Sequence, residues 1–181
     1  METYISILRG INVGGHNKIP MTGLKDLYEE LNLKNIITYI QSGNVIFKFA
    51  KVPSEQGLAK KIEKKILEKY GFDVPVIIRS LNEIENTLVT NPFLKQDGID
   101  IEKLHVTFLS DVPQKAQLEA IKKYYHSPEK FIILGKEVYV YCPNGYGNTK
   151  ISNTFFENKL KVTATTRNWK TVNKLADLAK E

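Results

Sequence analysis

The chain has 181 residues and a mass of 20.7 kDa, the size of one domain or of two small domains that share an interface. Its 42% hydrophobic and 25% charged residues exclude a disordered, collagen-like or coiled-coil chain, and no apolar run reaches the roughly 20 residues of a membrane helix. The 26 Lys and Arg residues exceed the 20 Asp and Glu residues, a mildly basic balance that permits an anionic partner without requiring one.

Strands and helices alternate in the first half of the chain. Short β-branched and aromatic runs predict strands, whereas apolar residues at helical spacing predict helices. The expected elements are, in order, a strand over 3–9, a loop from Gly10 to Pro20, a helix over 21–31 that Thr22 could cap, strands over 36–40 and 45–49, a helix over 54–70 with Ser54 as its cap, and a strand over 74–79 that Pro75 marks as a sheet edge.

This order, β-α-β-β-α-β, is the ferredoxin-like pattern. Because crossover connections are right-handed, the first two strands should run parallel, and the third should insert between them, antiparallel to both. The end of the first strand then lies beside the start of the third. We therefore expect the loop from Arg9 to Gly15 and the turn Ser42-Gly43-Asn44 at the same edge of the sheet.

The second half is less regular and predicts a second small α+β subdomain. Its expected elements are a helix over 81–89, a loop over 90–103, a strand over 104–109, a helix over 114–125, a hairpin of 130–134 with 137–141, a polar turn over 143–150, and helices over 152–159 and 168–179. No Gly/Ser/Pro-rich linker separates the halves. The expected division is therefore 1–80 and 81–181, with a packed interface.

Cysteine and histidine usage argues against a metal site. Cys142 is the single cysteine, so no internal disulfide can form, which fits a reducing cytoplasm, and a buried structural thiol is favoured over a nucleophile. His16, His105 and His126 are isolated, without metal-ligand spacing. The opening METYISILRG lacks the basic region and cleavage site of a signal peptide. We expect a cytoplasmic protein without structural zinc or another cofactor.

The motif LRGINVGG, residues 8–15, lies between the first expected strand and helix. Glycines let backbone N–H groups turn toward a bound anion, and the start of a helix adds partial positive charge. Arg9 could add a full charge. The motif is neither a G-x-G-x-x-G nor a Walker loop, and a wide turn explains the same residues, so both interpretations stay open.

Two other polar segments have the composition of turns. The run Gln41-Ser42-Gly43-Asn44 has ordinary turn composition and gains a ligand-binding interpretation only from its expected position beside the first motif. The run 143–148, PNGYGN, resembles a ligand loop, but its Asn-Gly and Gly-Asn pairs are common turn dipeptides, which favours the turn.

Residues 163–171, TATTRNWKT, form the last motif. Thr166 or Asn168 could cap the final helix, so that Arg167, hydroxyl groups and free helix N–H groups would share one region suited to an anion. Trp169, the single tryptophan, could wall a pocket or anchor the helix to the core.

Four strings in order resemble one bacterial family, called domain of unknown function 1697. They are LRGINVGG, TYIQSGNVIF, Asn91-Pro92-Phe93 and TRNWKTVNKL, and their order and spacing match along essentially the whole chain. The resemblance implies two α+β subdomains, the first ferredoxin-like. It implies no assigned activity and no established catalytic residues, so no residue role is carried over.

The leading hypothesis is a site for a small anionic or phosphate-bearing ligand, such as a nucleotide, in a cleft between the subdomains. The expected ligand-binding residues are Arg9, Asn12, Gly14, Gly15, Ser42, Asn44, Arg167, Asn168 and Trp169. Whether the protein is an enzyme stays open. His16 is the best base candidate, but the motifs contain no paired carboxylates for metal-dependent phosphotransfer.

Two alternatives belong to other classes. The ferredoxin-like sheet also carries RNA-binding domains, in which strand aromatics stack on bases, and Tyr4, Phe47 and Phe49 occupy such strands here. Solvent-exposed rings would favour RNA binding, whereas buried rings would exclude it. The aromatic residues of the strand 45–49 alternate with Ile46 and Lys48, which favours a buried position for the rings. The second alternative is a protein-interaction module without catalysis, with the edge strand 74–79 covered by a partner.

Overall fold

The computed structural model describes residues 1–50, 54–124 and 127–181. It divides into two compact units: Met1–Glu85 with Lys174–Glu181, and Asn86–Asn173. The sequence had assigned the whole of 81–181 to the second subdomain, whereas the last residues of the chain belong to the first unit.

The first unit holds one four-stranded antiparallel sheet with the order β2-β3-β1-β4. Its elements are β1 (Glu2–Leu8), α1 (Met21–Glu30), β2 (Lys34–Tyr39), β3 (Asn44–Phe49), α2 (Glu55–Tyr70) and β4 (Val76–Ser80). Strand β3 lies between β1 and β2 and is antiparallel to both, and β4 is an edge strand. These three expectations are therefore confirmed.

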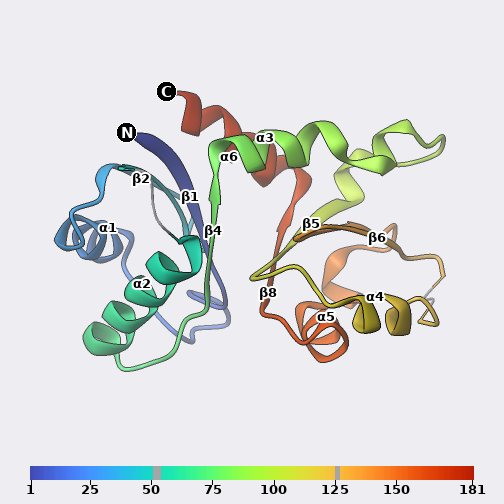
Figure 1. Cartoon of the computed structure of the whole chain (residues 1–181), viewed down its shortest axis with the longest axis horizontal. Helices are drawn as coiled ribbons and strands as arrows, with labels where there is room; N and C mark the ends of the chain where they lie inside the picture. Colours follow the sequence, from blue (N-terminus) through green and yellow to red (C-terminus); the bar gives the residue numbers. More distant parts are fainter. Residues whose placement is uncertain (51–53, 125–126) are drawn as a thin grey trace. The chain divides into compact units, whose positions relative to one another are not determined.

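Helices α1 and α2 cover one face of this sheet (Figure 1). The core between these helices and the sheet contains Tyr4 and Phe47, whose ring centroids lie 5.9 Å apart in a stacked arrangement. It also contains Tyr28 of α1, whose ring meets that of Phe47 edge-on at 5.7 Å. Phe49 is half-buried and packs against the same core. The strand aromatics are core residues, so they do not form the base-stacking surface that the RNA hypothesis required.

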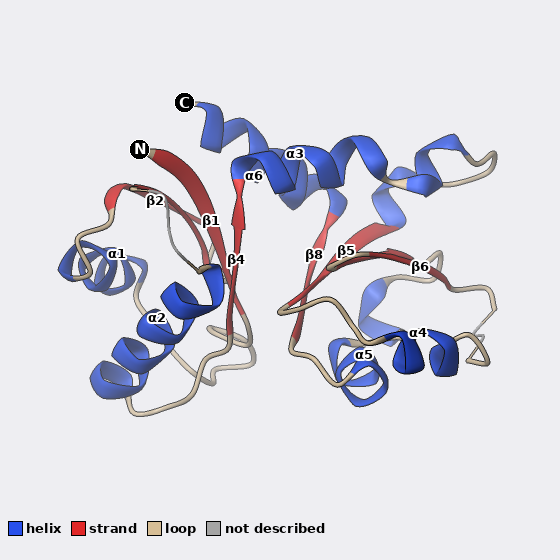
Figure 2. Cartoon of the chain, viewed as in Figure 1, coloured by secondary structure: helices blue, strands red, loops and turns tan. Residues whose placement is uncertain are grey.

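The second unit repeats the topology of the first. Its elements are β5 (Leu104–Leu109), α4 (Lys115–Ile121), β6 (Lys130–Leu134), β7 (Glu137–Tyr141), α5 (Asn153–Leu160) and β8 (Ala164–Asn168). The sheet order β6-β7-β5-β8 reproduces β2-β3-β1-β4 when strands are matched in chain order. Figure 2 shows α4 and α5 on one face of this sheet.

In both units the last strand runs directly into a helix. Helix α3 (Leu81–Thr90) follows β4, and α6 (Trp169–Lys180) follows β8. Each helix begins in one unit and ends in the other, because the boundaries fall after Glu85 and after Asn173. The chain is therefore a β-α-β-β-α-β-α arrangement used twice, although the sequence shows no exact repeat.

Several expectations for individual elements were wrong. Strand β8 was not expected, since Thr165-Thr166-Arg167-Asn168 has no apolar alternation, yet it pairs with β5 along five residues. Helix α4 ends at Ile121, and residues 125–126, including His126, lie outside the described residues. The loop 90–103 contains two short 3-10 helices, Pro92–Lys95 and Ile101–Lys103.

Thr22 does not cap α1. The helix begins at Met21, and the capping position is Pro20, whose side chain accepts no hydrogen bond. Ser54 does cap α2, where its Oγ accepts from the N–H of Gly57 at 3.1 Å. Within the described part of the chain, no helix has the length and apolarity needed to cross a membrane.

Candidate functional site

The segment 9–20, here called the glycine loop, connects β1 to α1. Residues with left-handed backbone follow one another along it: Gly10 (φ 70°), Asn12 (φ 55°), Gly14 (φ 57°), Gly15 (φ 80°) and Asn17 (φ 48°). Such alternation turns backbone N–H groups toward one side of a loop, the geometry of an anion-binding concavity. Gly14, Gly15 and His16 at its tip are exposed.

Asn12 holds the base of the glycine loop together. Its Nδ2 donates to the carbonyls of Ile19 at 3.0 Å and of Gln41 at 2.9 Å, and its Oδ1 accepts from the N–H of Ile19 at 2.9 Å. Its backbone N–H donates to the carbonyl of Asn17 at 3.1 Å. These bonds fix the glycine loop against the neighbouring turn, and a ligand contact by Asn12 stays a prediction.

The turn 41–44, here called the hairpin turn, lies against the glycine loop as the sequence predicted. The N–H of Leu8 donates to the carbonyl of Gly43 at 2.8 Å. A Cβ at Gly43 would come within 2.7 Å of Ile11 Cδ1 and 2.8 Å of Leu8 Cβ, so only glycine fits there. The two segments are thereby held in one rigid arrangement.

Asn44 and Ser42 serve the hairpin itself. Asn44 is buried, and its Nδ2 donates to the carbonyl of Tyr39 and to Oγ of Ser42, both at 3.1 Å. Arg9 is half-buried, and its backbone N–H donates to the carbonyl of Pro75 at 3.0 Å. These contacts give Asn44 and the Arg9 backbone fold-stabilising roles.

A depression of about 370 Å³ opens beside the glycine loop and the hairpin turn. It is lined by Asn12, Gly15, Lys18, Ile19, Pro20 and Gln41. Of the expected ligand residues, Asn12 and Gly15 line it. Lys18 and Gln41 were not among them, although Lys18 is the one lysine between Gly10 and Pro20 and could have been singled out on that ground.

The other three expected site residues lie in the second unit and have structural contacts there. Arg167 is 8% exposed; its Nη1 donates to the carbonyl of Thr166 at 2.9 Å and to Thr165 Oγ1 at 3.2 Å. Burial lowers the pKa of its guanidinium to about 10. Asn168 Oδ1 accepts from the N–H of Thr171 at 2.7 Å and so caps α6, as expected, and Trp169 is buried. That Arg9 and Arg167 share one cleft stays a prediction.

The polar run 143–148 contains the turn that its composition favoured, followed by a short 3-10 helix, Tyr146–Asn148. The ring of Tyr146 stacks on His105 at 4.8 Å, and its hydroxyl donates to Thr166 Oγ1 at 3.0 Å. Thr166 in turn donates to Asn153 Oδ1 at 2.6 Å. Burial lowers the pKa of the His105 imidazole, which favours its neutral form.

Cys142 is a buried thiol, as expected. It is 1% exposed, and burial raises the pKa of the thiol, which disfavours the nucleophilic thiolate. Among the described residues no group of three or more His, Cys, Asp or Glu side chains could hold a metal ion.

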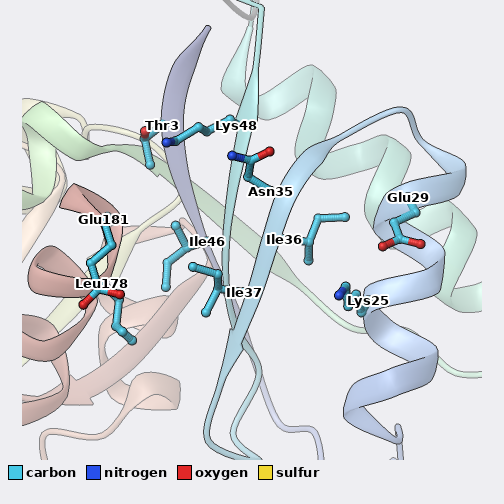
Figure 3. A pocket seen from close by; sticks show the side chains of 11 residues that line it. Thr3, Lys25, Glu29, Asn35, Ile36, Ile37, Ile46, Lys48, Leu178 and Glu181 are labelled. Atoms are coloured by element: carbon cyan, nitrogen blue, oxygen red, sulfur yellow. The ribbon is translucent and has the colours of Figure 1, made fainter.

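A second depression of about 370 Å³ surrounds the edge strand β2 in the first unit. Figure 3 shows Ile37 and Ile46 on the side of the strand that faces Leu178 of α6, and Ile36, Lys25 and Glu29 on the side of α1. Its charged lining residues are Lys25, Lys48, Glu29 and Glu181. Two lysines against two glutamates give no preference for an anion, unlike the depression at the glycine loop.

A family model described as "Protein of unknown function (DUF1697)" matches residues 1–139. The chain belongs to the DUF1697 family. The matched region contains the glycine loop, the hairpin turn and Asn91-Pro92-Phe93, whereas TRNWKTVNKL lies beyond it.

The fold of this DUF1697 chain is shared with a solved structure, the conserved bacterial protein SP0830 from Streptococcus pneumoniae. The two are 24% identical, with a TM-score of 0.76 over 98% of each chain, a likeness that shows the fold alone. No curated protein matches the chain.

Proposed function

We propose that the protein binds a small anionic or phosphate-bearing ligand, such as a nucleotide, at the glycine loop and the hairpin turn. One observation carries the proposal: Asn12 and Gly43 lock these two segments together around a depression that Lys18 and Gly15 line. The ligand would meet a rigid site, and little free energy would be lost in ordering the loop upon binding.

Each group at the site suits an oxyanion. Lys18 supplies an exposed ammonium group, and backbone N–H groups around Gly14 and Gly15 supply directional donors. Gln41 can donate through its side-chain amide. The DUF1697 match covers all of these residues.

Binding without catalysis accounts for this arrangement. His16 is exposed at the loop tip, with its backbone N–H donating to the carbonyl of Val13 at 3.0 Å. The lining residues of the depression contain no carboxylate and no cysteine that could act as a base or nucleophile. We therefore assign a ligand site and no reaction.

Thermal unfolding against a panel of inorganic phosphate, pyrophosphate, nucleotides, sugar phosphates and short RNA tests the proposal. A ligand that binds only the folded state raises the melting temperature by mass action. We expect a rise with at least one small phosphate-bearing compound, and its loss in Lys18→Ala. Lys64→Ala, at an exposed lysine of α2, is the matched control and should keep the rise.

A flat response to every small anion, or a rise that Lys18→Ala leaves intact, would overturn the proposal. A salt-sensitive rise with RNA alone would favour the nucleic-acid alternative.

We further infer that both units are ferredoxin-like, since each combines the β-α-β-β-α-β order with a third strand between the first two. The element order and the strand pairing support this classification.

A further inference from the structure

A half-buried tyrosine of the second unit lies close to two lysines. Tyr124 follows α4, and its backbone N–H donates to the carbonyl of Ile121 at 2.9 Å. The Nζ of Lys159, in the last turn of α5, lies 3.9 Å from the centroid of the Tyr124 ring, and the Nζ of Lys123 lies 5.3 Å from it. We call Lys123, Tyr124 and Lys159 the lysine–tyrosine cluster.

The cluster is held in place by packing. Phe155, also on α5, meets the Tyr124 ring edge-on at 6.0 Å and fixes the orientation of the ring. Each ammonium then gains from the electron-rich ring face, which limits the rotamers of two otherwise flexible side chains. The lysine–tyrosine cluster is therefore more ordered than a pair of ordinary surface lysines.

Positive charge in the cluster is not neutralised by the described residues around it. Neither Lys123 nor Lys159 forms an ion pair there. The neighbouring Glu119 is paired with Lys122 at 2.7 Å, and Glu157 Oε1 accepts from the N–H of Ala164 at 3.0 Å. The pKa of the Tyr124 hydroxyl is lowered, first by its hydrogen bond with Lys159 and then by the positive charges of Lys123 and Lys159.

The first unit contains a contrasting pair. Lys69 lies 5.9 Å from the ring centroid of Tyr70 at the end of α2, but its ammonium also lies 3.8 Å from Glu30 and donates to the carbonyl of Gly23 at 3.4 Å. That lysine has a carboxylate partner within its own unit. The charge of Lys69 beside Tyr70 is therefore neutralised, whereas the charge of the lysine–tyrosine cluster is not balanced by a described carboxylate.

We propose that the lysine–tyrosine cluster binds the phosphate group of a phosphate-bearing molecule, at a site separate from the glycine loop. The ammonium groups of Lys123 and Lys159 and the hydroxyl of Tyr124 would each donate to a phosphate oxygen. Three donors and no carboxylate acceptor suit a doubly charged oxyanion. Because Lys159 already covers one face of the ring, the cluster favours a phosphate over a stacked base.

Nuclear magnetic resonance of the full chain with labelled tyrosine Cζ carbons tests this proposal. The Tyr124 resonance is identified by its absence from Tyr124→Phe. Inorganic phosphate and adenosine monophosphate are titrated separately at constant ionic strength. We expect a saturable shift of this resonance and a rise in the pKa of the Tyr124 hydroxyl, because a bound anion disfavours the phenolate.

Matched variants separate the cluster from general charge effects. The single variant Lys159→Ala and the double variant Lys123→Ala/Lys159→Ala should each weaken the apparent affinity for the phosphate compound at least about tenfold. The variants Lys69→Ala and Lys18→Ala should leave this affinity unchanged. Response to inorganic phosphate identifies the phosphate alone as sufficient, and response only to adenosine monophosphate identifies a phosphate ester.

No saturable shift with either compound, or an affinity that survives loss of both Lys123 and Lys159, would overturn the proposal. Circular dichroism of each variant confirms that the fold is kept, so a negative result counts against the site itself. The glycine-loop proposal is tested by Lys18→Ala and this proposal by the variants of Lys123 and Lys159, so each proposal can fail without the other.

Discussion

Gly43 of the hairpin turn packs closely against Leu8 and against Ile11 of the glycine loop. Its φ of 79° is left-handed, and an added Cβ would overlap Ile11 and Leu8, both fully buried. We expect Gly43→Ala to lower the free energy of unfolding by about 2–5 kcal/mol, from backbone strain and overpacking together. Urea unfolding of the variant measures this loss.

Gly14→Ala is the control for that substitution. Gly14 also has a left-handed φ, of 57°, but an added Cβ would come no closer than 3.8 Å to His16. Its cost should be limited to backbone strain of about 1–2 kcal/mol. Equal losses for Gly43→Ala and Gly14→Ala would show that the glycine loop and the hairpin turn are not packed tightly together.

His105 makes the stability of the protein depend on pH. Burial lowers the pKa of its imidazole in the folded protein, so the unfolded chain binds the proton more tightly. Stability contributed by neutral His105 is therefore lost as pH falls below the ordinary histidine value of about 6.5. We expect the free energy of unfolding to fall between about pH 7.5 and pH 5.5.

The variant His105→Gln isolates that contribution. It removes the titrating group while keeping a polar side chain beside Tyr146. Urea unfolding at both pH values should give a smaller fall for the variant than for the parent protein. An identical fall would assign the pH dependence to other groups.

At the scale of elements, side-chain caps fix where helices begin. Asn168 caps α6 through its bond to the N–H of Thr171, whereas Thr22 makes no such bond at α1. We expect Asn168→Ala to cost about 1 kcal/mol of stability and Thr22→Ala to cost clearly less. Thermal unfolding of both variants checks this, and the reverse order would contradict the assignment of the caps.

Elements with a strong local pattern could be predicted from the sequence. Helix α2 shows its apolar stripe and its Ser54 cap, and the hairpin of β6 and β7 is marked by Gly135-Lys136. Strand β8 could not be predicted in this way. Its threonines are β-branched and favour a strand, but the run shows no apolar alternation, and pairing with β5 stabilises it as a strand.

At the scale of the molecule, strand order predicted that the glycine loop and the hairpin turn lie side by side, whereas the predicted ligand-binding residues stay a prediction. Strand order alone brought the glycine loop to the hairpin turn, as the contact of Asn12 with Gln41 confirms. Residue type pointed to Asn12 and Asn44 as ligand groups, and the structure shows that both amides also bond backbone carbonyls of the fold.

The two units share one topology but differ in the lengths of the segments that connect their strands and helices. The segment between first strand and first helix is 9–20 in the first unit and only 110–114 in the second. In the second unit, residues 142–152 separate the third strand from the second helix. Functional segments are commonly loops of this kind on a shared scaffold, so the glycine loop distinguishes the first unit.

Backbone amide resonances of the uniformly 15N-labelled protein, recorded during titration with pyrophosphate, test the central claim most directly. The account predicts saturable shifts at Gly14, Gly15 and Lys18 and at the hairpin turn, and their loss in Lys18→Ala while Lys64→Ala keeps them. Saturable shifts that leave residues 9–20 and 41–44 unmoved, or no shifts at all, would contradict the assignment of an anion site to the glycine loop.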